Sequence, residues 1–178
     1  RVLDLIDNGH TIQVTSDAAV SMTVDDRVFS LVQFHFHAPS EHTINGERAP
    51  LEAHLVMVED TGSLAVLGVL YEPGEVFPLF DTIISALPSK VGDERHLERL
   101  DLDFSESRPA GSAYYRYEGS LTTPPCTEGV TWFVVADRQS LGVGQIEQIV
   151  SHLHGNARPV QPLNERELFL VQPDPKEK

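Results

Sequence analysis

The sequence predicts a mainly β fold in which helices are minor and peripheral. Short apolar segments rich in β-branched and aromatic residues recur, turn-forming stretches such as EDTGS and VDDR separate several of them, and only two segments have helical apolar spacing. The length of 178 residues suits a single domain with a substantial core. No repeat or linker indicates a second one. We expect the domain to cover residues 1–170 and the Pro-rich tail at 171–178 to be loose.

Six segments are expected to form strands because they are short and rich in β-branched and aromatic residues. In chain order these are residues 19–24, 28–37, 52–59, 63–71, 113–119 and 130–136. The helical candidates are residues 77–87 and 144–156. The second candidate has apolar residues at helical spacing, namely Ile146, Ile149, Val150 and Leu153. Gly155 then supplies a helix stop signal.

The charge and apolar patterns exclude two classes of partner. Acidic residues outnumber Lys and Arg by 27 to 13, which gives a formal net charge of -14, and no basic cluster is present to bind phosphates. These features argue against nucleic acid as a partner. No apolar run reaches the roughly 20 residues that a membrane-spanning helix needs. The single cysteine, Cys126, is a buried small hydrophobe, a free thiol or half of a bridge to a cysteine outside this sequence.

Three histidines have the spacing of a metal site between two neighbouring strands. His35 and His37 are two residues apart in the second predicted strand, so both imidazoles project from one face. His54 lies in the next predicted strand, and a connection with Pro, Asn and Gly can lay the two strands side by side. The sequence therefore predicts that three imidazoles converge on one metal ion.

Strict alternation along the first of these strands assigns each residue to a face. It groups Phe29, Leu31 and Gln33 with the two histidines, and leaves the opposite, apolar face to Val28, Val32, Phe34 and Phe36 together with Ser30. On the partner strand the same parity places Glu52 beside His54. Gln33 and Glu52 are thus candidates to accept hydrogen bonds from ligating imidazoles and fix their orientation.

The donor set indicates which metal binds and what the site does. Three neutral nitrogens without a thiolate suit zinc in a catalytic site, with the fourth tetrahedral position left to water. Apart from His10, which is considered below, the other histidines are interpreted as structural residues. These are His42, His96, His152 and His154. A rival metalloprotein of the cupin class is suggested by HFHAPSE, in which Glu41 would be a ligand. The glycines that flank that motif and its later histidine element are absent here.

Several ordered motifs resemble the α-class carbonic anhydrases. They are QFHFH at 33–37, SEH at 40–42, E-x-HLV at 52–56, LAVLG at 64–68, GSLTTPPCTEGVTWFV at 119–134 and NARPVQPLN at 156–164. Because these motifs span nearly the whole chain, the sequence is identified as a member of that class. The resemblance implies a large, mostly antiparallel twisted central sheet with a few short peripheral helices. It also implies reversible hydration of carbon dioxide to bicarbonate and a proton by zinc-bound hydroxide.

The resemblance also implies roles for residues at and around the metal. His35, His37 and His54 would bind Zn²⁺, and Gln33, Glu52 and the carbonyl of Asn156 would orient them. Thr122 would accept a hydrogen bond from the nucleophile and donate one to Glu41. Thr123 would lie near bicarbonate. The apolar wall for carbon dioxide would consist of Val56, Val66, Leu121 and Trp132. His10 would export protons, with Asn8 and Gln13 as polar neighbours in the solvent network.

Other expectations concern the whole protein. The family's N-terminal segment has no counterpart before Arg1, and Cys126 occupies the position of a cysteine that extracellular members bridge to that segment. The short connections resemble the compact bacterial type, which predicts a periplasmic or secreted enzyme. The expected partners are carbon dioxide and bicarbonate, with sulfonamides and anions as inhibitors, and a homodimer is left open. The alternative function is that of a non-catalytic binding protein of the same fold.

Overall fold

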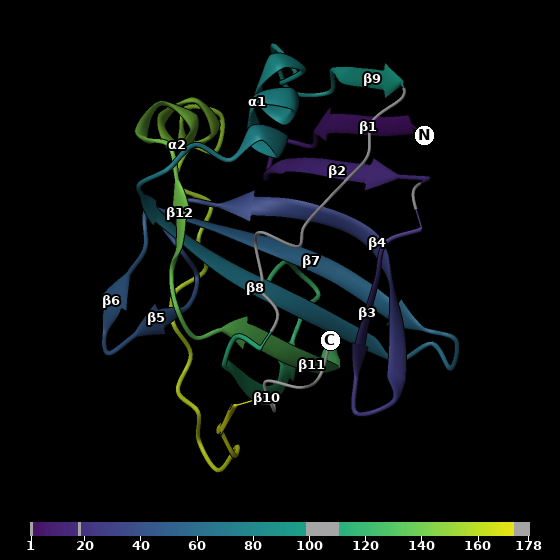
Figure 1. Ribbon diagram of the computed structural model, residues 1–178, viewed down its shortest axis with the longest axis vertical. Coiled ribbons are helices and arrows are strands. Elements are labelled where there is room, and N and C mark those ends of the chain that lie inside the picture. Colours follow the sequence, from purple (N-terminus) through teal and green to yellow (C-terminus); the bar gives the residue numbers. More distant parts are fainter. Residues whose placement is uncertain (1, 18, 99–110, 173–178) are drawn as a thin grey trace.

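The protein is built on one eleven-stranded sheet, seen in the computed structural model of the chain, which describes residues 2–17, 19–98 and 111–172 (Figure 1). The spatial order along the sheet is β13 (Phe169–Val171), β10 (Tyr114–Ser120), β11 (Glu128–Val135), β8 (Leu64–Pro73), β7 (Leu51–Glu59), β4 (Arg27–His37), β2 (Ile12–Ser16), β1 (Val2–Asp7) and β9 (Glu94–Glu98). Two short strands join this path, β3 (Ser21–Val24) beside β4 and β12 (Gln139–Leu141) beside β8. A separate hairpin is formed by β5 (Thr43–Ile44) and β6 (Glu47–Arg48).

The sheet is mostly antiparallel, as the sequence predicted. Among the described strands, the only parallel pairs are β8 with β11 and β8 with β12. All six predicted strands are present with small shifts at their ends. The prediction did not include β1, β2 and β9, which form one end of the sheet. β9 carries charged residues at several of its five positions, and its pairing with β1 rather than its composition makes it a strand.

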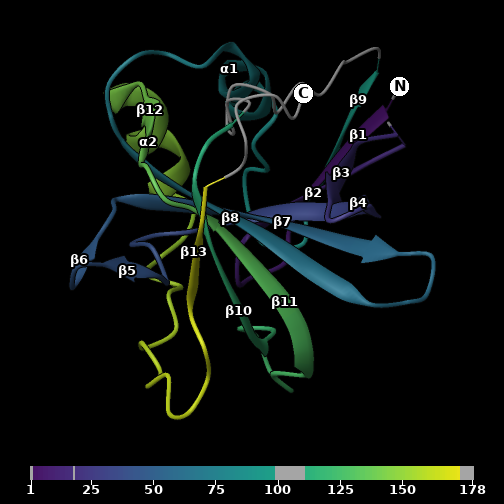
Figure 2. The same cartoon turned by 60° about the horizontal axis from the view of Figure 1, so that its bottom comes forward.

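Two helices cover one face of the sheet, α1 (Pro78–Ser85) and α2 (Val143–Val150) (Figure 2). Neither helix is long and apolar enough to cross a membrane, and no other helix of the described chain is. The second predicted helix was too long, because α2 ends at Val150 rather than near Gly155. Beyond it, the N–H groups of His152 and Leu153 donate to carbonyls three residues back, which tightens the chain into turns.

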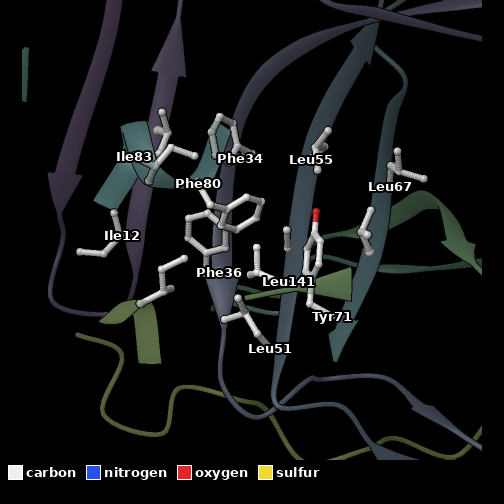
Figure 3. Close-up of a cluster of buried hydrophobic side chains, with 14 of the residues drawn as sticks. Ile12, Phe34, Phe36, Leu51, Leu55, Leu67, Tyr71, Phe80, Ile83 and Leu141 are labelled. Carbon is white, nitrogen blue, oxygen red and sulfur yellow. The ribbon is translucent and has the colours of Figure 1, made fainter. Parts of the chain in front are cut away.

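The main core lies between these helices and the sheet. Phe34 and Phe36 of β4 lie beside Phe80 and Ile83 of α1 in this cluster, which also includes Leu55 of β7 (Figure 3). A smaller buried cluster occupies the opposite face and contains Val56, Val66, Leu70, Trp132 and Val134, together with Ala49 and Val130. Alternation along β7, β8 and β11 thus supplies side chains to both clusters. The histidine-bearing face of β4 and β7 is the one that carries the smaller cluster.

Strict alternation along β4 was wrong for the first half of the strand. The register pairs Leu31 with Met57 and Gln33 with Val56, so Val32 is an extra residue in a β-bulge. Because of the bulge, the side chains of the residues before Val32 point to the face opposite to the one that strict alternation assigned to them. Phe29 is therefore buried in the main core on the side of Phe34, whereas Val28 and Val32 are exposed.

The ordered sheet extends slightly beyond the range expected for the domain. Val171 belongs to β13 and pairs with Tyr114, although it was assigned to the loose tail. Residues 173–178 lie outside the described residues, so the rest of that prediction is untested. The division into one domain at 1–170 likewise stays a prediction.

Candidate metal centre

The pairing of β4 with β7 brings the three predicted ligands together. The antiparallel register places His35 of β4 directly opposite His54 of β7, and His37 follows on the same face of β4. The ring centroids are 5.1 Å apart for His35 and His37, 5.4 Å for His35 and His54, and 4.6 Å for His37 and His54. One nitrogen from each ring lies within 4.8 Å of one nitrogen from the other two. The geometry is that of a candidate metal site.

Hydrogen bonds commit one nitrogen of each imidazole and leave the other available. His35 Nδ1 donates to Gln33 Oε1 (2.8 Å), and His37 Nδ1 donates to the carbonyl of Asn156 (3.2 Å). His54 Nε2 donates to Glu52 Oε1 (2.8 Å). The nitrogens left over are Nε2 of His35, Nε2 of His37 and Nδ1 of His54. His37 Nε2 is buried without a hydrogen-bond partner in the described structure, which is costly unless a metal or water satisfies it.

Burial keeps two of these rings in the form that binds metal. It holds the pKa of His35 well below its usual value, with the nearby His54 and His37 as further causes. Burial, followed by the charge of His54, lowers the pKa of His37 to about 3. Both imidazoles are therefore neutral at neutral pH, as metal ligands must be. Three imidazole nitrogens with fixed orientation fit a divalent ion of the zinc type.

Glu52 is the best-connected acceptor of the site and is fully buried. Its Oε1 accepts from His54 and also from His42 Nδ1 at 2.6 Å, while its Oε2 accepts from the His42 backbone N–H at 2.9 Å. Burial alone would raise the pKa of Glu52, but His42 and His54 outweigh it and hold that pKa well below its usual value. Burial alone would lower the pKa of His42, but Glu52 outweighs it and raises that pKa.

His42 and Tyr117 belong to the site, although the sequence did not assign them to it. The Tyr117 hydroxyl lies 2.7 Å from His42 Nε2, so a chain of contacts runs from Tyr117 through His42 and Glu52 to His54. Burial, and then the charge of Glu52, raises the pKa of Tyr117, which keeps its hydroxyl protonated. The two residues are 75 positions apart in sequence, so no local pattern could have joined them.

Glu41 has one occupied and one free carboxylate oxygen. The backbone N–H of Arg158 donates to Oε1 (2.8 Å), which also lies 3.3 Å from His37 Nδ1. Oε2 lies 3.8 Å from His54 Nδ1, is buried and has no hydrogen-bond partner among the described residues. Thr122 lines the same cavity of about 830 Å³ as Glu41. Their hydrogen bond is not formed in this structure and stays a prediction.

The predicted apolar wall packs beside His54. Val56, Val66 and Trp132 are buried in the smaller cluster, and Leu121 packs against it. The rings of Trp132 and His54 have centroids 4.8 Å apart. None of these four residues lines the 830 Å³ cavity, and Thr123 is exposed and does not line it either. Their contact with substrate stays a prediction.

The predicted proton-export residues lie at the end of β1 and along β2. His10 is exposed in the β1–β2 connection, where its carbonyl accepts from Asn156 Nδ2 (2.8 Å). Asn8 Oδ1 accepts from the backbone N–H groups of His10 and Thr11, both at 2.9 Å, so its side chain shapes the loop. Gln13 of β2 lies directly opposite His35 in the register with β4. Asn156 thus connects the His10 loop to the carbonyl that holds His37.

The remaining three histidines lie outside the candidate site. His96 is exposed on β9 and its Nδ1 lies 2.6 Å from Asp4 Oδ1. His152 Nδ1 lies 2.9 Å from the carbonyl of Gln148, one turn earlier in the chain. His154 is exposed in the turn after α2. These three positions agree with structural roles.

Comparisons with known proteins agree with this geometry. Residues 2–172 match the family model described as eukaryotic-type carbonic anhydrase. The carbonic anhydrase of Pectobacterium carotovorum is 40% identical over 163 residues, which cover 91% of this chain and 66% of that protein. The carbonic anhydrase of Neisseria gonorrhoeae is 41% identical over 167 residues, covering 93% of this chain and 66% of that protein. This chain therefore spans slightly less than two thirds of the length of these curated relatives.

Solved structures show the same likeness in three dimensions. The α-carbonic anhydrase of Photobacterium profundum superimposes with a TM-score of 0.85 at 42% identity, covering 94% of this chain and 76% of that one. The α-carbonic anhydrase of Thermovibrio ammonificans, solved in complex with the inhibitor sulfanilamide, gives a TM-score of 0.87 at 40% identity, with coverages of 94% and 74%. The cupin interpretation is thereby excluded. From its sequence, its sheet and its three converging imidazoles, the chain belongs to the eukaryotic-type, or α-class, carbonic anhydrase family.

Proposed function

We propose that the chain catalyses the zinc-dependent, reversible hydration of carbon dioxide to bicarbonate and a proton. The observation that carries the proposal is the set of three converging imidazoles, each with one nitrogen committed to a hydrogen bond and the other available. Hydration depends on all three ligands, whereas a relative without this activity can lose one of them and keep the fold. Family membership supports the same activity.

His35, His37 and His54 would hold the zinc ion. When bound, zinc supplies the Lewis acidity that makes water a nucleophile at neutral pH. Gln33, Glu52 and the Asn156 carbonyl keep the three rings in the tautomers that the metal requires. In the reaction, the oxygen of water adds to the carbon of carbon dioxide and a proton is released.

Two further groups of residues have assigned roles in the proposal. Thr122 would donate its hydroxyl proton to the free Oε2 of Glu41 and so keep its own oxygen as an acceptor for the attacking water. Val56, Val66, Leu121 and Trp132 would present an apolar surface to carbon dioxide, with Thr123 near the bicarbonate product. A nonpolar substrate gains little from polar contacts, so an apolar surface beside the metal suits it.

The test combines metal analysis with a hydration assay on the whole chain. Zinc content after dialysis with the metal, and the rate of carbon dioxide hydration, are measured for the wild type, His37→Ala and the control His96→Ala. We expect about one zinc per wild-type chain, sulfonamide-sensitive hydration, and loss of both in His37→Ala because only two imidazoles remain. His96→Ala should match the wild type, since His96 is exposed and outside the site. Stoichiometric zinc without hydration would favour the non-catalytic binding protein.

We propose that His10 exports the proton, assisted by Asn8 and Gln13. His10 is exposed, and an imidazole side chain that water can reach is suited to exchange protons with buffer. His10→Ala should lower turnover in weakly buffered solution, and added imidazole should restore it. His96→Ala again serves as the control. Unchanged turnover of His10→Ala at low buffer concentration would remove His10 from this role.

Further proposals concern the protein's surroundings. Sulfonamides are expected to inhibit because the related Thermovibrio ammonificans enzyme was solved with sulfanilamide, and competition with this compound in the hydration assay tests it. A periplasmic or secreted location is proposed, with Cys126, which is free here, bridged to a cysteine outside this sequence. Cell fractionation of the source organism and thiol titration of the native protein test these two points. Sedimentation tests whether the chain forms a homodimer.

A further inference from the structure

Arg166 joins the C-terminal segment to strand β10. This segment leaves α2, passes β5 and β6 and returns beside β10 as β13 (Figure 2). Nε and Nη2 of Arg166 donate to the carbonyls of Leu163 (3.0 Å) and Pro162 (2.9 Å) in its own segment. Nη1 donates to the carbonyl of Glu118 on β10 (3.2 Å). All three guanidinium nitrogens thus donate to backbone carbonyls, two in the C-terminal segment and one on β10.

The same guanidinium lies against Tyr117. Its central carbon is 5.6 Å from the centroid of the Tyr117 ring, a distance at which a cation and an aromatic ring attract each other. The Tyr117 ring also stacks on Trp132, with centroids 6.2 Å apart and planes 7° from parallel. Arg166 therefore holds Tyr117 in two ways, through its ring and through the neighbouring carbonyl of Glu118.

Tyr117 is the outer end of the chain of contacts that reaches the metal site. Its hydroxyl lies 2.7 Å from His42 Nε2, and His42 Nδ1 donates to Glu52 Oε1 at 2.6 Å. The same oxygen of Glu52 accepts from His54 Nε2 at 2.8 Å. Because one carboxylate oxygen serves both rings, a change in the orientation of His42 moves the acceptor that orients His54.

We propose that Arg166 is a positioning residue for the metal centre, which acts through Tyr117, His42 and Glu52 on the ligand nitrogen of His54. The inference rests on the proposed zinc site. Groups that orient a ligating imidazole commonly change metal affinity by about 10- to 100-fold when removed. Arg166 is further from the ligand than such groups, so the expected effect is smaller, on the order of 3- to 10-fold.

Arg116 offers a matched control on the same strand. Its guanidinium carbon is 5.7 Å from the centroid of the Phe133 ring and it pairs with Asp25 at 2.8 Å. Phe133 belongs to the main core, and Arg116 precedes Tyr117, so alternation directs it to the other face of β10. Arg116→Ala removes a similar cation–aromatic contact without touching the chain to His54.

The experiment measures the zinc dissociation constant of the whole chain by competition with a chromophoric chelator. Arg166→Ala should weaken zinc binding by about 3- to 10-fold. Arg166→Lys should restore only part of the affinity, because a compact ammonium cannot serve three carbonyls at fixed angles as the guanidinium does. Arg116→Ala should stay within about 2-fold of the wild type, since it leaves every group that orients a ligand in place.

A double-mutant cycle with Tyr117→Phe separates positioning from general support of the fold. Removing the Tyr117 hydroxyl breaks the link to His42, so Arg166→Ala should have little further effect on zinc affinity in that background. An equal loss in both backgrounds, or unchanged affinity in Arg166→Ala alone, overturns the inference while leaving the proposed function standing. Failure of the wild-type chain to bind zinc overturns the proposed function and this inference with it.

Discussion

At the scale of single residues, the site depends on close approach between neighbouring strands as much as on its ligands. Gly68 of β8 lies opposite His54 of β7, and a Cβ at this position would be 2.9 Å from Glu52 Oε1. Real Cβ atoms essentially never approach an oxygen that closely. Since the oxygen concerned also accepts from His42 and His54, it cannot yield without disturbing both. Glycine at this position therefore makes room for the buried carboxylate.

Gly68→Ala is expected to weaken zinc binding by about 10-fold or more, because the displaced carboxylate no longer orients His54. The measurement is the zinc dissociation constant by chelator competition. Gly144→Ala is the control, since a Cβ there meets nothing within 4 Å and helical alanine is preferred to glycine. Wild-type affinity in Gly68→Ala would show that Glu52 has another way to hold His54.

At the scale of elements, the β4–β7 pair carries the ligands at one end and an ion pair at the other. Nε and Nη2 of Arg27 donate to Glu59 Oε1 and Oε2 at 3.1 and 2.8 Å. Hydrogen bonds from Arg27, and then from Thr61, lower the pKa of Glu59 to about 2. The bulge at Val32 lies between this pair and the histidines. Odd-numbered residues of β4 therefore point to one face before the bulge and to the opposite face after it.

The Arg27–Glu59 pair predicts a defined pH dependence of stability. The folded pKa of Glu59 is below its usual value, so the unfolded chain binds more protons at acid pH. The stabilisation is therefore present above about pH 4.5 and is lost as the pH falls from there through about 2. Glu59→Gln should have a lower urea midpoint than the wild type at pH 7, and the difference should shrink at pH 3. Glu47→Gln, at a side chain 80% exposed, should show no such change.

At the scale of the whole molecule, the metal centre joins parts of the chain that are far apart in sequence. Its candidate ligands come from β4 and β7 near the middle of the sheet. The carbonyl that accepts the hydrogen bond of His37 belongs to Asn156, which is 119 residues away in sequence. Asn156 also donates through Nδ2 to the carbonyls of His10 and Phe36. A metal ion held by these residues would therefore stabilise contacts between distant segments of the fold.

Removing zinc is expected to lower the free energy of unfolding. A ligand that binds only the folded state contributes about 2.7 kcal/mol when its free concentration is 100 times its dissociation constant. Thermal unfolding of the wild type should shift to lower temperature after chelation and return when zinc is added. The midpoint of His37→Ala should not respond to zinc. An unresponsive wild type would mean that the three histidines bind no ion in the folded chain.

The three histidines, Gln33 and Glu52 could be found from the sequence, because side-chain direction within a strand has a period of two and depends only on local backbone geometry. The helix candidates followed from local apolar spacing, and six of the strands, β3, β4, β7, β8, β10 and β11, followed from their β-rich composition. Family motifs added Glu41, Thr122 and Asn156. Local rules failed where one extra residue, Val32, changed the parity of β4, and where α2 ended in turns before Gly155.

The sequence by itself therefore determined the fold class, the family and the candidate ligands of this protein. Only the tertiary structure decided which nitrogen each ligand leaves available, and that His42, Tyr117 and Arg166 continue the site outward. The physical reason is that these contacts join residues of distant segments, such as His42 and Tyr117. Which segments meet depends on the free energy of burial of the entire chain. This quantity cannot be read from the pattern of any single segment.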